Sequence, residues 1–315
     1  MEKVKGEMKR YLIIDGNLLL HKSQGVHGSL KTKVKGEVVH TGIPYGFLKA
    51  IVRLNKHYQF LRTCVVFDSG VAPMSVKQHA RKPVVARDLL PRVDVFEDYK
   101  SSRGPLKIEI ARGKKLLDRF LNCLPITVTY ASPLYEADDV VAHVSNEVWL
   151  RRQDTNTDVI IYSDDKDFHQ LIHGPKNGFR VFCHKRKDVI MDRKKLKEKF
   201  GLSPRQFVKY LALVGDSIDD IPGVKGVGPK TAVKLITEKR IKKTISKEDY
   251  EIYKRNISLI ELSADQRVVL ACRHGRLDMK KLNVLLNKFK MVSFQREQDQ
   301  SVLRQLKPIK FLREC

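Results

Sequence analysis

Two aspartates and a run of glycines lie within one short segment, residues 215–232, and together they suit chemistry on phosphates. Asp216 and Asp219 are three residues apart, so on a helical turn both carboxylates can face the same way. Oxygen ligands of this kind are what Mg²⁺ or Mn²⁺ accept. The residues that follow are the glycines and the cation of a tight turn: Gly223, Gly226, Gly228 and Lys230. The segment therefore combines a metal-ligand pair with a candidate phosphate clamp.

The glycine turn is typical of a helix–hairpin–helix clamp. Glycines allow backbone N–H groups to approach a phosphate closely. Lys230 and the start of the next helix add positive potential at the same point, and Thr231 beside them is a further candidate for DNA binding. The alternative is a generic turn between two helices, but the carboxylate pair immediately upstream favours the clamp.

Three further aspartates follow short apolar runs. Asp15 ends the run 11–15, Asp68 ends the run 63–68, and Asp165 follows the run 158–163. Continuous runs rich in Val and Ile are typical of strands buried on both faces, as in a parallel sheet. Helical patterns separate these runs, at 45–57, 106–124 and 137–150. Strands that alternate with helices predict an α/β fold, with the three aspartates at the carboxyl edge of the sheet.

Other carboxylates could join this edge. A single aspartate after a strand is often only a turn or helix cap, and acidic residues in a first helical turn complement the helix dipole. The set is too large for that explanation alone, because so many like charges would repel without a counter-charge. Two divalent ions could supply it and activate water for phosphodiester hydrolysis. The additional candidates are Glu136, Asp138 and Asp139 at a helix start, and Asp167 two residues after Asp165.

Composition points to a polyanionic partner. The 315 residues include 61 Lys and Arg against 36 Asp and Glu, a net charge of +25, which favours nucleic acid over a merely soluble basic surface. The five cysteines form no C-x-x-C pair, so neither a zinc ribbon nor a disulfide framework is indicated, and a reducing cytoplasm is expected. No apolar run is long enough to span a bilayer, and the first ten residues lack the apolar core of a secretory signal.

Several of these motifs, in this order, resemble the flap endonuclease family. The likeness is strongest to the stand-alone phage 5′ nucleases and to the 5′-nuclease domain of bacterial DNA polymerase I, and it runs from about Tyr11 to Leu262. The motifs that carry it are Ile14-Asp15-Gly16-Asn17, Gly42-Ile43-Pro44-Tyr45-Gly46, Val66-Phe67-Asp68, Tyr99-Lys100-Ser101-Ser102-Arg103, Glu136-Ala137-Asp138-Asp139, Ser163-Asp164-Asp165-Lys166-Asp167 and residues 215–232.

The resemblance implies a role for each candidate residue. One metal group would comprise Asp15, Asp68, Glu136, Asp138 and Asp139, and the second would hold Asp216 and Asp219, with Asp165 and Asp167 between them. Lys100 would enter from the base of a helical arch and support the charge of the scissile phosphate. Tyr99 would stack on a terminal base, the alternative being a packed aromatic, and Arg103 would contact the phosphate backbone. The turn at Gly223, Gly226 and Gly228, with Lys230 and Thr231, would grip duplex DNA, and K⁺ is a candidate ion there.

The resemblance also predicts the architecture. We expect a PIN-like, mostly parallel sheet flanked by helices in residues 1–191, with the arch at about 71–112. Residues 192–290 are expected to form a helix–hairpin–helix subdomain, and residues 291–315 a basic tail. Residues 71–97 form a longer and more basic approach to the arch than the family pattern, including Lys77, Arg81, Lys82, Arg87 and Arg92. This segment could either enlarge the arch or form a solvated insertion. Asp220 stands where an Asn is common, and could be a surplus carboxylate rather than a ligand.

The sequence therefore predicts a monomeric, Mg²⁺- or Mn²⁺-dependent 5′-3′ exonuclease and flap endonuclease. Its partners would be DNA with a 5′ flap, nick, gap or free 5′ end, with RNA–DNA hybrids and replication proteins as further candidates, in a bacterial or phage-infected cytoplasm and away from membranes. One alternative is a PIN-type RNA endonuclease, although such enzymes are usually shorter and lack the clamp. The other is a non-catalytic protein that binds branched DNA, against which the intact carboxylate set argues.

Overall fold

The computed structural model describes residues 8–60, 62–72, 92–102, 107–133, 135–151, 156–176, 179–185, 189–263 and 265–310. Within these ranges, every helix is too short or too polar to traverse a lipid bilayer. The segment 73–91, which holds most of the basic approach to the arch, and Arg103 lie outside the described residues.

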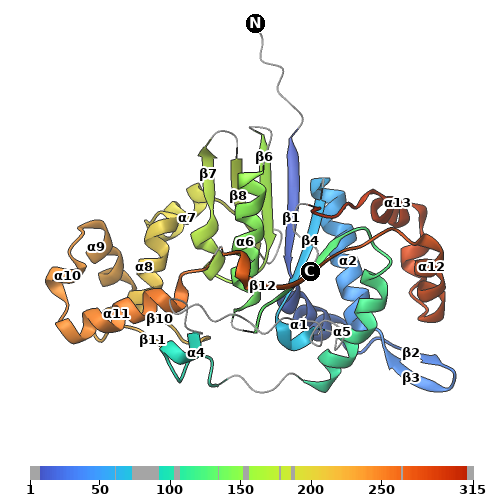
Figure 1. Cartoon of the computed structure of the whole chain (residues 1–315), viewed down its shortest axis with the longest axis horizontal. Coiled ribbons are helices and arrows are strands. Elements are labelled where there is room, and N and C mark those ends of the chain that lie inside the picture. The colour runs from blue at the N-terminus through green and yellow to red at the C-terminus, as the bar shows by residue number, and fades with distance from the viewer. Residues whose placement is uncertain are drawn as a thin grey trace, which may run out of the picture.

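A central sheet organises the chain (Figure 1). In the described residues it has eight strands in the order β12-β5-β4-β1-β6-β8-β7, with β9 paired to β8. The five central strands are parallel, and β12, β7 and β9 pair antiparallel with their neighbours. The strands are β1 (Lys9–Asp15), β4 (Arg62–Phe67), β5 (Thr127–Ala131), β6 (Thr157–Tyr162), β7 (His173–Lys176), β8 (Phe179–Lys185), β9 (Val189–Met191) and β12 (Val269–His274).

Strand register brings the predicted aspartates to one edge. Asp15 ends β1 and pairs with Val66 of β4, so Asp68 lies just beyond the same edge. On the other side Ile14 pairs with Tyr162, the last residue of β6, so the loop that carries Asp165 starts beside β1. The predicted parallel sheet with convergent carboxyl ends is confirmed.

Helices cover both faces of the sheet because side chains alternate along each strand. Ile13 packs on one face with α6 (Ala137–Leu150). Leu12 and Ile14 pack on the other face, in a core shared with α1 (Gly16–His27), α2 (Gly42–Tyr58), α5 (Ile108–Leu121) and α12 (Met279–Lys288). A short hairpin of β2 (Lys31–Val34) and β3 (Glu37–His40) projects beside this second group (Figure 1).

A helical subdomain packs on the α6 side and continues the same core. It contains α7 (Arg193–Phe200), α8 (Pro204–Val214), α9 (Pro229–Thr237), α10 (Ile241–Thr244) and α11 (Lys247–Ile260). The hairpin of β10 (Gly215–Asp216) and β11 (Ile221–Pro222) connects α8 to the glycine turn before α9. The helical subdomain also contacts α4 (Arg92–Val95), which lies against α11.

The C-terminal region differs from the expected division of the chain. Residues 269–290, assigned above to the helical subdomain, return to the sheet: β12 pairs with β5, and α12 packs beside α5. The apolar run at residues 268–272 is short and ends in charged residues, which hid this edge strand. In the expected basic tail, α13 (Glu297–Gln305) follows η5 (Val292–Gln295) and packs against α2.

Candidate metal centre and nucleic-acid interface

Hydrogen bonds hold the carboxylates of β1 and β4 in place. Asp15 caps α1, where Oδ1 accepts from the backbone N–H of Leu18 at 3.0 Å and Oδ2 accepts from Ser163 Oγ at 2.8 Å. Asp68 accepts from the side-chain amide of Asn17, and its Oδ1 accepts from the N–H of Ala137 at 2.7 Å. The two strand ends are therefore tied to each other and to the start of α6.

The environment of Asp15 disfavours its charge. Burial raises the pKa of Asp15 from its ordinary 3.8 to about 6, and the negative charges of Asp165 and Asp68 add to this rise. Asp138 has a pKa well above its ordinary value, because of burial and of the charges of Asp165 and Asp15. A bound cation would relieve both effects.

Glu136 lies in a cluster of cations and a hydroxyl at the base of the arch. Its Oε1 is 2.6 Å from Lys100 Nζ, and its Oε2 is 2.7 Å from a guanidinium nitrogen of Arg92. Tyr99 donates its hydroxyl to the same Oε2 at 2.9 Å. Burial alone would raise the pKa of Glu136, but the charges of Lys100 and Arg92 bring it below its ordinary value.

Both carboxylate oxygens of Asp139 already have partners within the protein. Its Oδ1 lies 2.8 Å from Arg92 and accepts from the N–H of Ser263 at 2.9 Å, while its Oδ2 accepts from the N–H of Glu136 at 3.2 Å. The side chain is 2% exposed. This placement ties the arch base, the start of α6 and the segment after α11 together.

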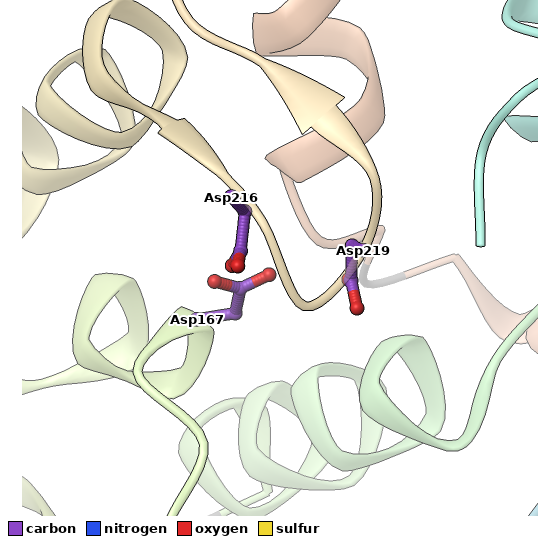
Figure 2. A group of neighbouring side chains, drawn as sticks. All are labelled: Asp167, Asp216 and Asp219. Atoms are coloured by element: carbon purple, nitrogen blue, oxygen red, sulfur yellow. The ribbon is translucent and has the colours of Figure 1, made fainter. Parts of the chain in front are cut away.

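Asp167, Asp216 and Asp219 form a second group (Figure 2). Asp167 begins η2 (Asp167–Leu171), and the other two lie in the β10–β11 hairpin. One carboxylate oxygen of each lies within 4.8 Å of the others, and Figure 2 shows Asp167 and Asp216 directed toward one another. Asp165 links this group to the first, since its Oδ1 accepts from the N–H of Asp167 at 2.9 Å.

The second group fits a divalent cation. Asp167 Oδ1 is buried without a hydrogen-bond partner, which is costly unless an ion completes it. Burial and the charges of Asp165 and Asp216 raise the pKa of Asp167 well above its ordinary value. Lys166 lies 3.0 Å from Asp216 and supplies part of the counter-charge. An all-oxygen donor set of this kind suits a divalent cation.

The glycine turn has the geometry of an exposed backbone clamp. Gly223 is packed so closely that a Cβ atom would lie 2.3 Å from the carbonyl oxygen of Val214. Gly226 has φ +74°, in the left-handed region that side chains rarely adopt, and has open space around it. Gly228 is the N-cap residue of α9, and Lys230 and Thr231 are exposed in its first turn.

Tyr99 and Lys100 occupy the metal centre rather than open solvent. Tyr99 is 8% exposed and is hydrogen-bonded to Glu136, the arrangement of a packed aromatic, so stacking on a base stays a prediction. Lys100 Nζ lies 3.5 Å from Asp219 Oδ2 as well as beside Glu136. Burial would lower the pKa of Lys100, but the charges of Glu136 and Asp219 raise it above its ordinary value.

The structure adds residues to the site that sequence reasoning did not assign. Arg92, noted only as part of a basic segment, makes ion pairs with Glu136 and Asp139. Because 44 residues separate Arg92 from Glu136 in the sequence, no local pattern indicates this contact. Asn17 and Ser163, by contrast, lie within recognised motifs and bond to Asp68 and Asp15.

Comparison with protein families gives two matches that together span residues 10–274. Residues 10–201 match the 5′-3′ exonuclease N-terminal resolvase-like domain. Residues 202–274 match the 5′-3′ exonuclease C-terminal SAM fold. The helices α12 and α13 lie beyond these matches.

Among curated proteins, the chain is 30% identical over 313 residues to a 5′-3′ exonuclease of Aquifex aeolicus, covering 93% of this chain and 96% of that protein. It is 32% identical over 229 residues to the thermostable DNA polymerase I of Thermus thermophilus, covering 73% of this chain but 24% of the polymerase.

Two solved structures have a similar fold. T5 5′-exonuclease with divalent metal ions (zinc) bound has a TM-score of 0.58 at 16% identity, with 94% of this chain and 97% of that chain covered. Flap endonuclease-1 from Methanococcus jannaschii has a TM-score of 0.56 at 16% identity, with 95% and 93% covered.

Proposed function

The chain belongs to the 5′-3′ exonuclease family, and we propose that it hydrolyses phosphodiester bonds at 5′ ends and 5′ flaps of branched or gapped DNA. The proposal rests chiefly on one observation: three buried carboxylates from two distant segments, one with an unpartnered oxygen, converge beside the aspartates of the sheet edge. In this family of nucleases, acidic side chains clustered in this way are expected to hold metal ions.

We propose that the two groups of carboxylates bind two divalent ions, Mg²⁺ or Mn²⁺. Asp15, Asp68, Glu136 and Asp138 would hold one, Asp216 and Asp219 the other, and Asp165 and Asp167 would lie between them. Asp139, although it bonds to protein groups here, remains a candidate of the first group. When bound, the ions would activate water and neutralise charge on the attacking and leaving oxygens.

The protein's own cations and turns would position the DNA. Lys100 would leave its ion pairs with Glu136 and Asp219 to support the charge of the scissile phosphate, and Arg103 would contact the backbone near it. Tyr99 would stack on a terminal base only after breaking its hydrogen bond to Glu136. The exposed turn at Gly226 and the start of α9 would grip the duplex through backbone N–H groups, with K⁺ as a candidate ion there.

The wider setting is also a proposal. T5 flap endonuclease has been solved in a complex with DNA and metal ions, which supports DNA as the substrate here. Cleavage of RNA–DNA hybrids would extend the activity to primer removal, with replication proteins as partners. We expect a monomer that acts in a bacterial or phage-infected cytoplasm, with residues 1–191 as its catalytic domain.

Substitution of Asp165 by asparagine tests this function. Single-turnover cleavage of an end-labelled 5′-flap duplex with Mg²⁺ should fall by about a thousandfold or more, as expected when an essential electrostatic group is lost. Asp164→Asn is the matched control, because Asp164 is the neighbouring carboxylate and pairs with Lys22 at 3.0 Å. Undiminished cleavage by the Asp165 variant would refute the mechanism.

Two parallel assays separate the other functions. Flap DNA and single-stranded RNA should be offered side by side to the wild-type protein, and a preference for RNA would identify an RNA endonuclease. Binding of flap DNA without cleavage in either Mg²⁺ or Mn²⁺ would identify a non-catalytic binder.

A further inference from the structure

Asp220 is a carboxylate of the β10–β11 hairpin that contacts the segment carrying Lys100. One oxygen, Oδ2, accepts two hydrogen bonds from Ser102, at 2.9 Å from its backbone N–H and at 2.6 Å from its hydroxyl. Asp216 and Asp219, its neighbours in the hairpin, instead contribute oxygens to the acidic group with Asp167. Asp220 therefore serves a different contact from the two aspartates that precede it.

Ser102 lies two residues after Lys100, so this contact fixes the segment that presents the lysine. The backbone N–H of Lys100 donates to the carbonyl oxygen of Asp219 at 3.0 Å. Together the three hydrogen bonds join the arch base to two consecutive residues of the hairpin. The Lys100 ammonium then lies 2.6 Å from Glu136 and 3.5 Å from Asp219, within the metal centre.

The backbone at this junction needs outside support. Lys100 has φ +55° and Asp220 has φ +56°, both in the left-handed region. Residues with side chains adopt such angles only where surrounding contacts hold them, although Asp tolerates the region better than most. Each of these two residues takes part in one contact across the junction: Asp220 accepts from Ser102, and the backbone N–H of Lys100 donates to Asp219.

The hairpin also continues directly into the clamp. Pro222 ends β11, and Asn256 of α11 donates to its carbonyl oxygen at 2.7 Å. The glycine turn follows within four residues. Arg255 of the same helix stacks on Phe96 at the arch base, 4.1 Å from the ring centroid. Helix α11 thus contacts both the end of the hairpin and the segment that carries Lys100.

We propose that Asp220 is a positioning residue, which holds Lys100 at the metal centre by binding Ser102 and which couples the clamp to the arch. The inference rests on the proposed nuclease function and deepens it. Asp220 then acts on the rate of cleavage through Lys100, and neither binds metal nor grips duplex. Asparagine at this position would keep a side-chain oxygen as acceptor, so it would preserve the contact.

Kinetic comparison of Asp220→Ala and Asp220→Asn tests this role. Single-turnover cleavage of a 5′-flap duplex should slow about tenfold in the alanine variant, since displacement of a catalytic group by about 1 Å can cost up to about a hundredfold. The asparagine variant should stay within about twofold of wild type. Duplex affinity in EDTA and Mn²⁺ affinity by calorimetry should be unchanged in both. A wild-type rate for the alanine variant, or an equal loss in the asparagine variant, would overturn the proposal.

A double variant shows whether Asp220 acts through Lys100. Adding Asp220→Ala to Lys100→Ala should cause no further loss of rate, because the group being positioned is already absent. A further tenfold loss would overturn the proposal. Asp249→Ala is the matched control: this exposed aspartate also accepts from a serine, Ser246, at 3.0 Å, but at the N-terminal end of α11. Its rate should equal that of wild type.

One readout does not depend on cleavage. In the metal-free protein, acetylation of Lys100 followed by mass spectrometry should be several-fold faster in Asp220→Ala than in wild type or Asp249→Ala. If Asp220→Ala does not fold, Ser102→Ala takes its place. Its cleavage rate should fall about threefold, because the backbone N–H of residue 102 can still donate to Asp220. A wild-type protein that cuts no DNA would refute the proposed function, whereas unchanged Lys100 reactivity would refute this inference alone.

Discussion

Replacing Asp15 by asparagine should stabilise the metal-free protein while it disables the metal centre. The pKa of Asp15 is raised from 3.8 to about 6 in the folded protein. The folded state therefore holds the proton of Asp15 more tightly than the unfolded chain. Stability falls as pH rises from about 4 to about 6, and the cost is fully present above that window. One unit of pKa corresponds to about 1.36 kcal/mol, so the cost at pH 8 is about 3 kcal/mol.

Asparagine can replace Asp15 with little other change. Its side-chain oxygen can still accept from the N–H of Leu18, and asparagine is as good a helix N-cap as aspartate. Its amide group faces Ser163, whose hydroxyl can act as acceptor instead of donor. The substitution therefore removes the buried charge without leaving a cavity.

Urea unfolding in EDTA measures the effect. The Asn variant should exceed wild type by about 3 kcal/mol at pH 8 and by about half of that at pH 5, because the wild-type cost shrinks as Asp15 is protonated. Asp164→Asn, which removes a carboxylate paired with Lys22, should show no such gain. Mn²⁺ should stabilise wild type more than the Asp15 variant. An Asp15 variant that is no more stable than wild type at pH 8, or a gain independent of pH, would refute the reasoning.

Arg92→Met should lower the free energy of unfolding by about 3–5 kcal/mol in urea, because it leaves Asp139 buried without its cation and removes one of the cations beside Glu136; a loss below about 1 kcal/mol would contradict this. Gly226→Ala should weaken duplex binding several-fold in fluorescence anisotropy, since a left-handed φ of +74° costs alanine about 1–2 kcal/mol. Gly25→Ala, at a helical glycine with open space, is its control and should bind normally. Affinity for DNA should fall steeply with salt for a chain of net charge +25, and a flat plot of log affinity against log salt would place the basic surface elsewhere.

The sheet edge could be predicted from the sequence because one rule governs several residues at once. Parallel strands end at the same edge, so Asp15, Asp68 and Asp165 had to converge once their strands were recognised. The glycine turn could be predicted in the same way, since glycines at 223, 226 and 228 satisfy a local backbone requirement, and its role as a clamp stays a prediction. Both signals lie within short segments, where type and spacing carry the information.

Contacts between distant segments could not be predicted in this way. Arg92 reaches Glu136 and Asp139 across 44 and 47 residues, and Ser102 reaches Asp220 across 118. Nothing in the local pattern distinguishes these side chains from solvated ones. The return of β12 to the sheet was hidden for a related reason, because one short strand reveals its pairing only through its partner, β5.

The cations around the acidic groups balance part of their charge, and they set a condition for metal binding. Lys166 pairs with Asp216, and Lys100 lies between Glu136 and Asp219. Each of these carboxylates is a candidate metal ligand, so binding of a divalent ion competes with the lysine beside it. Where an ion took the place of Lys100 at Glu136, the ammonium would be available to a substrate phosphate. The ion pairs thus balance part of the acidic charge and hold a cation beside the carboxylates proposed to bind metal.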